Sequence, residues 1–208
     1  SGTGVVSGAE NSGTKFNDAN MNGVQDAGEA SISGWPISWT EPAPSGASDN
    51  GFTLLSIVAA LPGDWLITEG QPTGVETVSI LDGVQQSFFP NANPLVTVPV
   101  AGTSGETHAV VYGNVGIGSL TACKVYANNT NDPIAGWKVT LQQVKDAAGN
   151  AVAGSVDTEL TGSNGCYTWS NLYPGEYVVT EIMALNYAPV GPTSYTVDLT
   201  STLSYVGG

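Results

Sequence analysis

Apolar and polar residues alternate in several short runs of this 208-residue chain, and turn residues separate the runs. The runs GWPISWTE (34–41) and GWKVTLQQV (136–144) have the two-residue period of strands with one buried face. GDWLITE (63–69) and GEYVVTE (175–181) follow Pro-Gly pairs, which favour turns. TSYTVDLTSTLSYV (193–206) predicts two short strands, and no run keeps a helical period. The pattern therefore predicts an all-β protein of short strands packed as a sandwich.

The predicted elements occur twice. Three blocks of the first half return in the second half in the same order. The paired blocks are 13–18 with 122–127, 31–39 with 133–141, and 50–70 with 164–182. Chance similarity rarely keeps such an order, so we interpret the chain as two copies of one module. The Gly-rich stretch YGNVGIGS (112–119) is the predicted joint, and its shortness favours a fixed relation between the modules.

This organisation predicts three segments. Residues 1–12 form a polar, Gly/Ser-rich N-terminal segment, residues 13–114 a first β-sandwich, and residues 115–208 a second one. Chain ends of this composition fray unless a partner holds them. We therefore expect GTGVVSGA (2–9) to act as an assembly strand that packs on, or adds a strand to, a neighbouring copy.

The two halves share the parts of one signature. The parts are KF-x-D-x-N-x-N-G-x-x-D-x-G-E, I-x-G-W, N-G-x-Y and L-P-G-x-Y-x-V-x-E; the first half keeps the opening, and the second keeps the middle and the end better. On these motifs each half resembles the SdrD B-like and Cna B-type modules of microbial surface proteins. The resemblance implies two tandem Greek-key β-sandwich domains of the Ig-like or transthyretin-like kind. Such modules serve as stalks, adhesin parts and fibre subunits, so the resemblance specifies a fold more closely than a role.

Charge excludes two classes of partner. Four Lys and no Arg stand against 18 carboxylates, which gives a net charge of −14. No basic surface is available to neutralise phosphate, so we expect no nucleic acid and no anionic membrane surface as partner. No apolar run approaches the ~18 residues of a membrane span, so we expect no membrane insertion. The composition, low in Lys and rich in Asn, Thr and Gly, favours an extracellular, cell-surface location, and residues 1–12 look like the start of a mature chain whose signal peptide has been removed.

The stretch DANMNGVQDAGE (18–29) has the ligand spacing of an EF-hand calcium loop. Its oxygen ligands would come from Asp18, Asn20, Asn22, the Val24 carbonyl, Asp26 and Glu29. Gly23 permits the sharp turn that such a loop requires. The alternative is a polar turn rich in Asn and Asp. Because no helix pair flanks the loop, the expected Ca2+ is structural, and with three carboxylate ligands its affinity is modest.

The second half has cysteines in place of this loop. Cys123 and Cys166 are the two cysteines of the chain, and NNTNDP (128–133) offers a single carboxylate. A disulfide between them would add about 4 kcal/mol to the free energy of unfolding, and would stabilise this end of the second module as calcium stabilises the first. The alternative is two buried thiols. Asn128 begins an Asn-Asn-Thr glycosylation sequon, a weak signal by itself.

Two lysines, Lys15 and Lys124, occupy equivalent positions, as do the acids Glu69 and Glu181. The resemblance to Cna B-type modules implies an isopeptide bond between a first-strand Lys and a last-strand Asn or Asp, assisted by a buried Glu. Lys15, Glu69 and Asn114 are the candidate set in the first half. A desolvated Lys loses its proton more easily, and the neutral amine can attack an amide carbonyl. The sequence favours the alternative, a partly buried Lys–Glu ion pair, and the second half has no Asn or Asp at the comparable place.

No catalytic set emerges, because the one His, His108, cannot by itself supply a zinc site or a nucleophilic triad. Trp35 and Trp137 are expected in the cores rather than in a sugar platform.

We therefore expect a non-enzymatic extracellular structural protein, a subunit of a surface fibre, filament or stalk that is rigidified by Ca2+ and a disulfide. Its expected partners are copies of itself in a head-to-tail polymer. The alternative is an adhesin or carbohydrate-binding module of a larger secreted protein, with a glycan or a host or cell-surface protein as partner.

Overall fold

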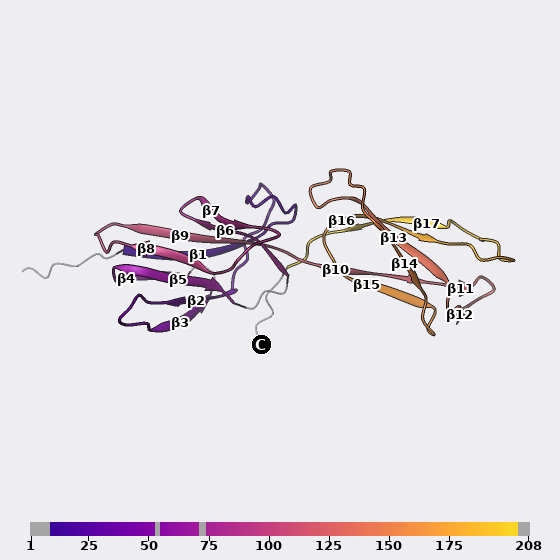
Figure 1. The fold of residues 1–208 in the computed structure, drawn as a ribbon, viewed down its shortest axis with the longest axis horizontal. Coiled ribbons are helices and arrows are strands. Elements are labelled where there is room, and N and C mark those ends of the chain that lie inside the picture. Colours follow the sequence, from indigo (N-terminus) through magenta and orange to yellow (C-terminus); the bar gives the residue numbers. More distant parts are fainter. Residues whose placement is uncertain (1–8, 53–54, 71–73, 204–208) are drawn as a thin grey trace, which may run out of the picture. The chain divides into compact units, whose positions relative to one another are not determined.

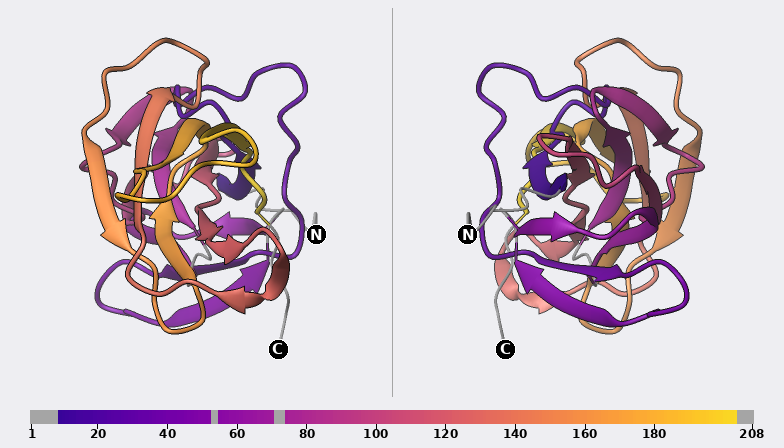
Figure 2. Two further views of the ribbon diagram at one scale, coloured as in Figure 1. Left: turned by 90° about the vertical axis from the view of Figure 1, so that its right-hand side faces the viewer. Right: turned by 90° about the vertical axis from the view of Figure 1, so that its left-hand side faces the viewer.

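A computed structural model describes residues 9–52, 55–70 and 74–203 of the chain (Figure 1). These residues form strands and connecting loops without a helix, as the ribbon views show (Figures 1 and 2). The prediction of an all-β protein is therefore confirmed. Within the described ranges, no helix has the length and apolar character needed to cross a membrane.

The chain divides into two compact units. Unit 1 comprises Ser1–Val115 together with Thr202–Gly208, and unit 2 comprises Gly116–Ser201. The boundary lies in the Gly-rich stretch 112–119. Each unit is described below by itself.

Unit 1 is a sandwich of two sheets. The five-stranded sheet has the order β4 (Leu55–Ala60), β1 (Ala9–Asn17), β9 (Thr107–Val115), β6 (Val75–Leu81) and β7 (Val84–Phe88). The four-stranded sheet has the order β3 (Ser48–Phe52), β2 (Pro36–Thr40), β5 (Gly63–Glu69) and β8 (Val96–Val100). Strand β1 is paired along both edges, antiparallel to β4 and parallel to β9. This double pairing places β1 inside its sheet.

Alternation of side chains builds the core of unit 1. Val96, Val98 and Val100 point inward from β8 while the residues between them are exposed. Tyr112 of β9 enters the same core and donates a hydrogen bond from its hydroxyl to the Ile67 carbonyl of the facing sheet, at 2.9 Å. Burying each large apolar side chain contributes about 1.5–3 kcal/mol. The two sheets are thus joined by apolar packing and by a buried hydrogen bond.

Unit 2 has a smaller set of strands. Its four-stranded sheet has the order β14 (Val156–Leu160), β13 (Lys138–Lys145), β16 (Gly175–Glu181) and β17 (Ser194–Leu199). Two two-stranded sheets complete it, β10 (Gly118–Cys123) with β15 (Cys166–Leu172), and β11 (Val125–Tyr126) with β12 (Asn129–Pro133). Trp137 and Trp169 lie in its core. Trp35 is fully buried in unit 1, so the placement of Trp35 and Trp137 in the cores is confirmed.

The strands of the two units correspond in chain order. The matching pairs are β1 with β10, β2 with β13, β3 with β14, β4 with β15, β5 with β16 and β8 with β17. Strands β6, β7 and β9 have no counterpart among the described residues of unit 2. The run 193–206 was expected to give two strands; β17 is the one described, and residues 204–206 lie outside the described residues.

Candidate functional site

A lysine is buried at the centre of unit 1. Lys15 on β1 is 1 % exposed, Glu69 on β5 is 5 % exposed, and Asn114 on β9 is fully buried. The Lys15 ammonium group donates a hydrogen bond to Glu69 Oε2, and Asn114 Nδ2 donates to Glu69 Oε1 at 2.9 Å. The structure thus brings together the three residues of the candidate isopeptide set, with the carboxylate in contact with both the others.

The strand register explains this meeting. In the parallel pair of β1 and β9, Lys15 lies opposite Tyr112, and Asn17 lies opposite Asn114. Because side chains alternate along a strand, Lys15, Tyr112 and Asn114 all point to the face that holds the core. Glu69 reaches the same place from the facing sheet, since it continues the inward-pointing series of β5.

Burial shifts the pKa of the lysine in this cluster. Burial lowers the pKa of Lys15, an effect larger than the attraction of Glu69, which raises it. The Lys15 amine also lies 4.1 Å from the centroid of the Trp35 ring, which covers it. The carbonyl oxygen of Asn114 is buried and has no hydrogen-bond partner among the described residues. An amine that loses its proton more easily therefore lies in a cluster with an amide whose oxygen is unengaged.

A second acid, Glu76, belongs to this cluster. It lies on β6, directly opposite Asn114 in the antiparallel pair of β6 and β9, and is 8 % exposed. Burial first, and then the neighbouring Glu69 carboxylate, raise the pKa of Glu76 to about 9. Glu76 is therefore neutral at neutral pH. Sequence reasoning missed it because β6 has no counterpart in the second half, and only the sheet order brings it beside Asn114.

Unit 2 contains half of the same set. Lys124 donates a hydrogen bond to Glu181 at 2.5 Å, and its amine lies 4.6 Å from the centroid of the Trp137 ring. These contacts repeat those of Lys15 with Glu69 and Trp35. The side chains of Lys124 and Glu181 are 22 % and 17 % exposed, however, whereas their unit 1 equivalents are 0 % exposed. No described residue of unit 2 takes the place of Asn114, because β9 has no counterpart there.

The loop proposed to bind calcium connects β1 with β2. Its base is closed by two backbone hydrogen bonds, from Asn17 N to Ala30 O at 3.0 Å and from Ile32 N to Lys15 O at 2.8 Å. Gly23 has a left-handed φ of +76°, and a Cβ at this position would lie 2.7 Å from the Phe88 ring. A glycine is therefore required here both for the turn and for close packing on β7.

The side chains of this loop form a hydrogen-bonded cluster. Asp18 is fully buried and accepts hydrogen bonds from the backbone N–H groups of Asn22 and Gly23, at 3.0 and 2.9 Å. Asp26 Oδ2 accepts from the amides of Asn20 and Asn22, at 2.8 and 2.6 Å, and these bonds lower the pKa of Asp26.

Glu29 closes the loop. Its carboxylate accepts hydrogen bonds from Asp26 N at 3.0 Å and from Asn20 N at 3.4 Å. Val24, whose carbonyl is the remaining expected ligand, has an exposed side chain. Within the described ranges, no three His, Cys, Asp or Glu side chains gather into a metal-binding group. The expected ligands thus share one loop, and their oxygens are engaged by the loop's own N–H groups.

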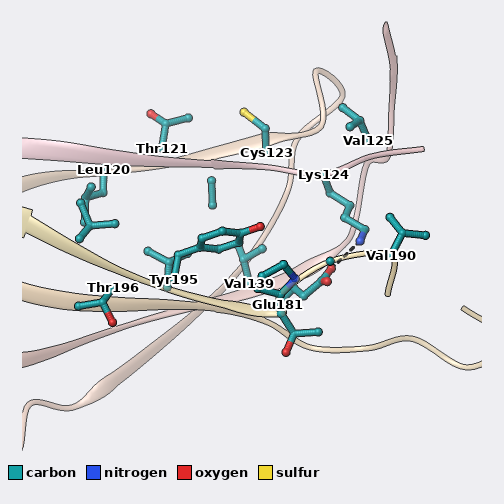
Figure 3. A pocket seen from close by; sticks show the side chains of 16 residues that line it. Leu120, Thr121, Cys123, Lys124, Val125, Val139, Glu181, Val190, Tyr195 and Thr196 are labelled. Atoms are coloured by element: carbon teal, nitrogen blue, oxygen red, sulfur yellow. Dashed lines mark hydrogen bonds and ion pairs between the residues drawn. The ribbon is translucent and has the colours of Figure 1, made fainter. Parts of the chain in front are cut away.

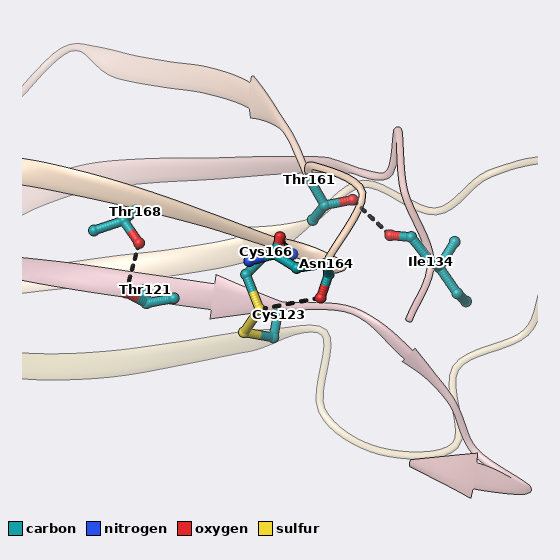
Figure 4. Close-up of a disulfide and its surroundings, with 7 residues drawn as sticks. All are labelled: Thr121, Cys123, Ile134, Thr161, Asn164, Cys166 and Thr168. Carbon is teal, nitrogen blue, oxygen red and sulfur yellow. Dashed lines mark hydrogen bonds between the residues drawn. A yellow bond between two sulfur atoms is a disulfide. The ribbon is translucent and has the colours of Figure 1, made fainter. Parts of the chain in front are cut away.

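Cys123 and Cys166 form a disulfide, as the sequence predicted (Figure 4). They are directly opposite residues of the antiparallel pair of β10 and β15, with Cα atoms 4.0 Å apart. The hydroxyls of Thr121 and Thr168 form a second cross-strand link at 2.8 Å. The disulfide stands one residue before Lys124 and holds β10 against β15 at this end.

The remaining candidates lie outside these clusters. His108 has Asp82 and Glu106 oxygens at 2.8 Å from its two ring nitrogens. Burial lowers the pKa of His108, but the hydrogen bonds to both carboxylates outweigh it, and the net change is upward. Asn128 lies in the exposed turn between β11 and β12. All five tryptophans are buried or half-buried, so the described residues present no open tryptophan platform for a sugar ring.

A protein-family model, the SpaA prealbumin-like fold domain, matches residues 118–205. Unit 2 therefore has the prealbumin-like fold, which is the transthyretin-like fold that the sequence resemblance implied. The match confirms the resemblance to B-type Greek-key modules for this half of the chain.

No curated protein matches the chain. Solved structures similar to it include the Bacillus anthracis TIE protein (14 % identity, TM-score 0.37), of which the chain spans 31 % while 94 % of the chain is covered. They also include a streptococcal ancillary pilin (15 % identity, TM-score 0.40), of which it spans 60 % with 94 % of the chain covered. A third is the shaft pilin SpaA from Lactobacillus rhamnosus GG (12 % identity, TM-score 0.34), with 97 % of this chain and 98 % of that one covered.

Removal of the disulfide is expected to destabilise unit 2. The double substitution C123S/C166S frees a loop with a sequence separation of 43 residues, which should lower the free energy of unfolding by about 4 kcal/mol because the unfolded chain regains entropy. Urea unfolding followed by tryptophan fluorescence measures this loss. The matched control is T121S/T168S, which keeps the neighbouring cross-strand pair polar and should leave the free energy of unfolding within about 0.5 kcal/mol of the wild type. An unchanged midpoint in the cysteine variant would contradict the prediction.

Proposed function

We propose that this chain is a non-enzymatic structural subunit of an extracellular surface fibre, which joins copies of itself head to tail. The observation that carries the proposal is the enclosed contact of Lys15, Glu69 and Asn114. A reactive set that no substrate can reach serves the stability of the domain rather than turnover. The match of unit 2 to the SpaA domain supports the same class of role, and two of the similar structures named above are pilins.

The enclosed set has the parts for an internal cross-link. The neutral amine of Lys15 attacks Cγ of Asn114, an Nζ–Cγ amide bond forms, and the Cγ–Nδ2 bond breaks. Glu69, which contacts both nitrogens, takes a proton from Nζ and returns one to the leaving nitrogen, which departs as ammonia. Because β1 and β9 are the first and last strands of unit 1, the bond would connect its two ends covalently. Tension applied along the chain would then pass through the cross-link without unfolding the sandwich between them.

We also assign a structural Ca2+ to the loop of residues 18–29. The donor set contains only oxygens, which Ca2+ prefers, and the buried Asp18 carboxylate supplies a fixed charge. The ion would be held by Asp18, Asn20, Asn22, the Val24 carbonyl, Asp26 and Glu29. Its chemistry here is electrostatic, because it would neutralise three carboxylates that otherwise repel one another within one loop.

The cross-link is tested by intact mass after reduction of the disulfide. We expect the chain to be about 17 Da lighter than its sequence mass, the loss of one ammonia. E69Q should restore the full mass, because the proton carrier is removed. The matched control is E181Q, which alters the equivalent acid of unit 2 and should keep the lighter mass. A wild-type chain at full mass, or a light E69Q chain, would sink the assignment.

Calcium is tested by thermal unfolding with added Ca2+ and with a chelator. Calcium should raise the melting temperature of unit 1, with an apparent Kd on the order of 10⁻⁴ to 10⁻³ M, as in extracellular modules. D26N should weaken the effect at least about tenfold, since it removes a ligand charge. D132N, which alters the corresponding loop of unit 2, is the control and should respond like the wild type. Identical melting with calcium and with chelator speaks against the site.

Self-assembly is the test of the function as a whole. The purified full chain, concentrated in steps and followed by light scattering, should form species that grow by whole subunits, and electron microscopy should show filaments. The same samples on a glycan array should give no binding above background. A chain that stays monomeric at every concentration, or that binds one glycan class with saturable affinity, would replace the fibre subunit with the adhesin alternative.

A further inference from the structure

The strand that completes the sandwich of unit 1 is missing from the described part of unit 2. In unit 1, β1 has β4 on one edge and β9 on the other. In unit 2 the equivalent strand β10 pairs with β15, and its other edge has no strand partner among residues 116–201. An edge of unpaired N–H and C=O groups is a template for an added strand.

A groove lies beside this open edge (Figure 3). It has a volume of about 540 Å³ and lies among β10, β13, β16 and β17. Its apolar lining includes Leu120, Ala122, Val139, Val179, Tyr195 and Val197. Lys124 and Glu181 meet at one end of it, as the dashed line in Figure 3 marks. Three threonines, Thr121, Thr193 and Thr196, also line the groove, whose charged side chains are Lys124 and Glu181 at that end.

Equivalent residues on the first strand of each unit are more exposed in unit 2, because a covering strand is lacking among its described residues. The inward-pointing residues of β1, Gly13 and Lys15, are buried, whereas their equivalents are half-buried: Ala122 on β10 and Lys124 directly after it. In unit 1, β9 supplies the cover, since Val110 and Tyr112 lie opposite Gly13 and Lys15. A strand in the equivalent place would bury the inner face of β10 in the same way.

A stretch near the N-terminus resembles the covering strand in sequence. GVVSG (4–8) resembles AVVYG (109–113), the central part of β9. It precedes β1, which begins at Ala9, and residues 1–9 carry no charged side chain. An uncharged segment with small side chains suits this groove, because it fits between apolar side chains and threonines and adds no repulsion to a chain of net charge −14.

We propose that residues 2–9 of a second copy enter the groove of unit 2 as a strand parallel to β10. By the register of β1 with β9, Thr3, Val5 and Ser7 then lie opposite Leu120, Ala122 and Lys124 respectively. Each chain offers one such strand and one groove, so the contact is heterologous and repeats without closing, which produces a filament. The inference rests on the proposed self-assembly and identifies the contact that drives it.

In the same alignment, the contact between subunits is non-covalent. Ala9 takes the position that Asn114 holds in unit 1, so the incoming strand brings no amide to Lys124. Ser7 instead places a hydroxyl opposite the lysine, beside its contact with Glu181. Subunits therefore associate through backbone hydrogen bonds and apolar burial, while the ion pair is retained and becomes enclosed.

The alternation of the strand supplies the test. V5D places a charge on the face that enters the groove and should reduce assembly of the full chain at least tenfold in light scattering. V6D places the same charge on the opposite face and should assemble like the wild type. Equal assembly of both variants, or loss only in V6D, overturns the proposed strand.

Cross-linking identifies the acceptor. A chain carrying T3C mixed with a chain carrying L120C should give disulfide-linked pairs under oxidation, and G4C with L120C should give at least about tenfold fewer, because position 4 faces away. A dilute T3C/L120C double variant that closes on itself as a linked monomer would show that the chain fills its own groove, and would overturn the proposal.

If the wild type never polymerises, the proposed function fails; if it polymerises but V5D does so equally, only the groove assignment fails.

Discussion

The parallel pairing of β1 with β9 decides whether a unit of this chain is closed. In unit 1 this pairing places the last strand beside the first, covers the core and carries Asn114 to Lys15. In unit 2 the first strand has no such neighbour among the described residues, and the same kinds of side chain remain half-buried. Strand β9 therefore distinguishes unit 1 from the described part of unit 2. The candidate cross-link depends on its presence in unit 1, and the groove depends on the lack of an equivalent strand among the described residues of unit 2.

The two lysine–glutamate pairs differ most clearly in how far each is buried. Lys15 and Lys124 have the same contacts, a carboxylate and a tryptophan ring. Around Lys15, water is excluded, so the charged forms are costly and proton transfer inside the cluster becomes accessible. Around Lys124, partial exposure keeps an ordinary ion pair. Similar lysine contacts thus occur in a fully enclosed cluster in unit 1 and in a partly exposed pair in unit 2.

Much of this could be predicted from the sequence. Two-residue alternation predicted the strands, and Pro-Gly pairs predicted the turns before β5 and β16. The positions of the cysteines in the repeat predicted the disulfide. These features depend on neighbouring residues or on a repeat that aligns the halves. The structure has the Lys15–Glu69 ion pair that the sequence favoured, but the pair is fully rather than partly buried, because burial depends on strand order, which local patterns do not encode. Glu76 was missed for the same reason.

For the proposed filament, the disulfide at the end of β10 has a consequence for where subunits can join. Cys123 and Cys166 pin this strand to β15 one residue before Lys124. Disulfides form in oxidising compartments and are rare in the reducing cytosol. Without the disulfide, β10 would be held by its hydrogen bonds to β15 and by the packing of Leu120 and Ala122 on the core, and unit 2 would be less stable. In the proposed assembly, formation of the disulfide would therefore stabilise the unit that accepts the next subunit, and an oxidising compartment would favour growth over a reducing one.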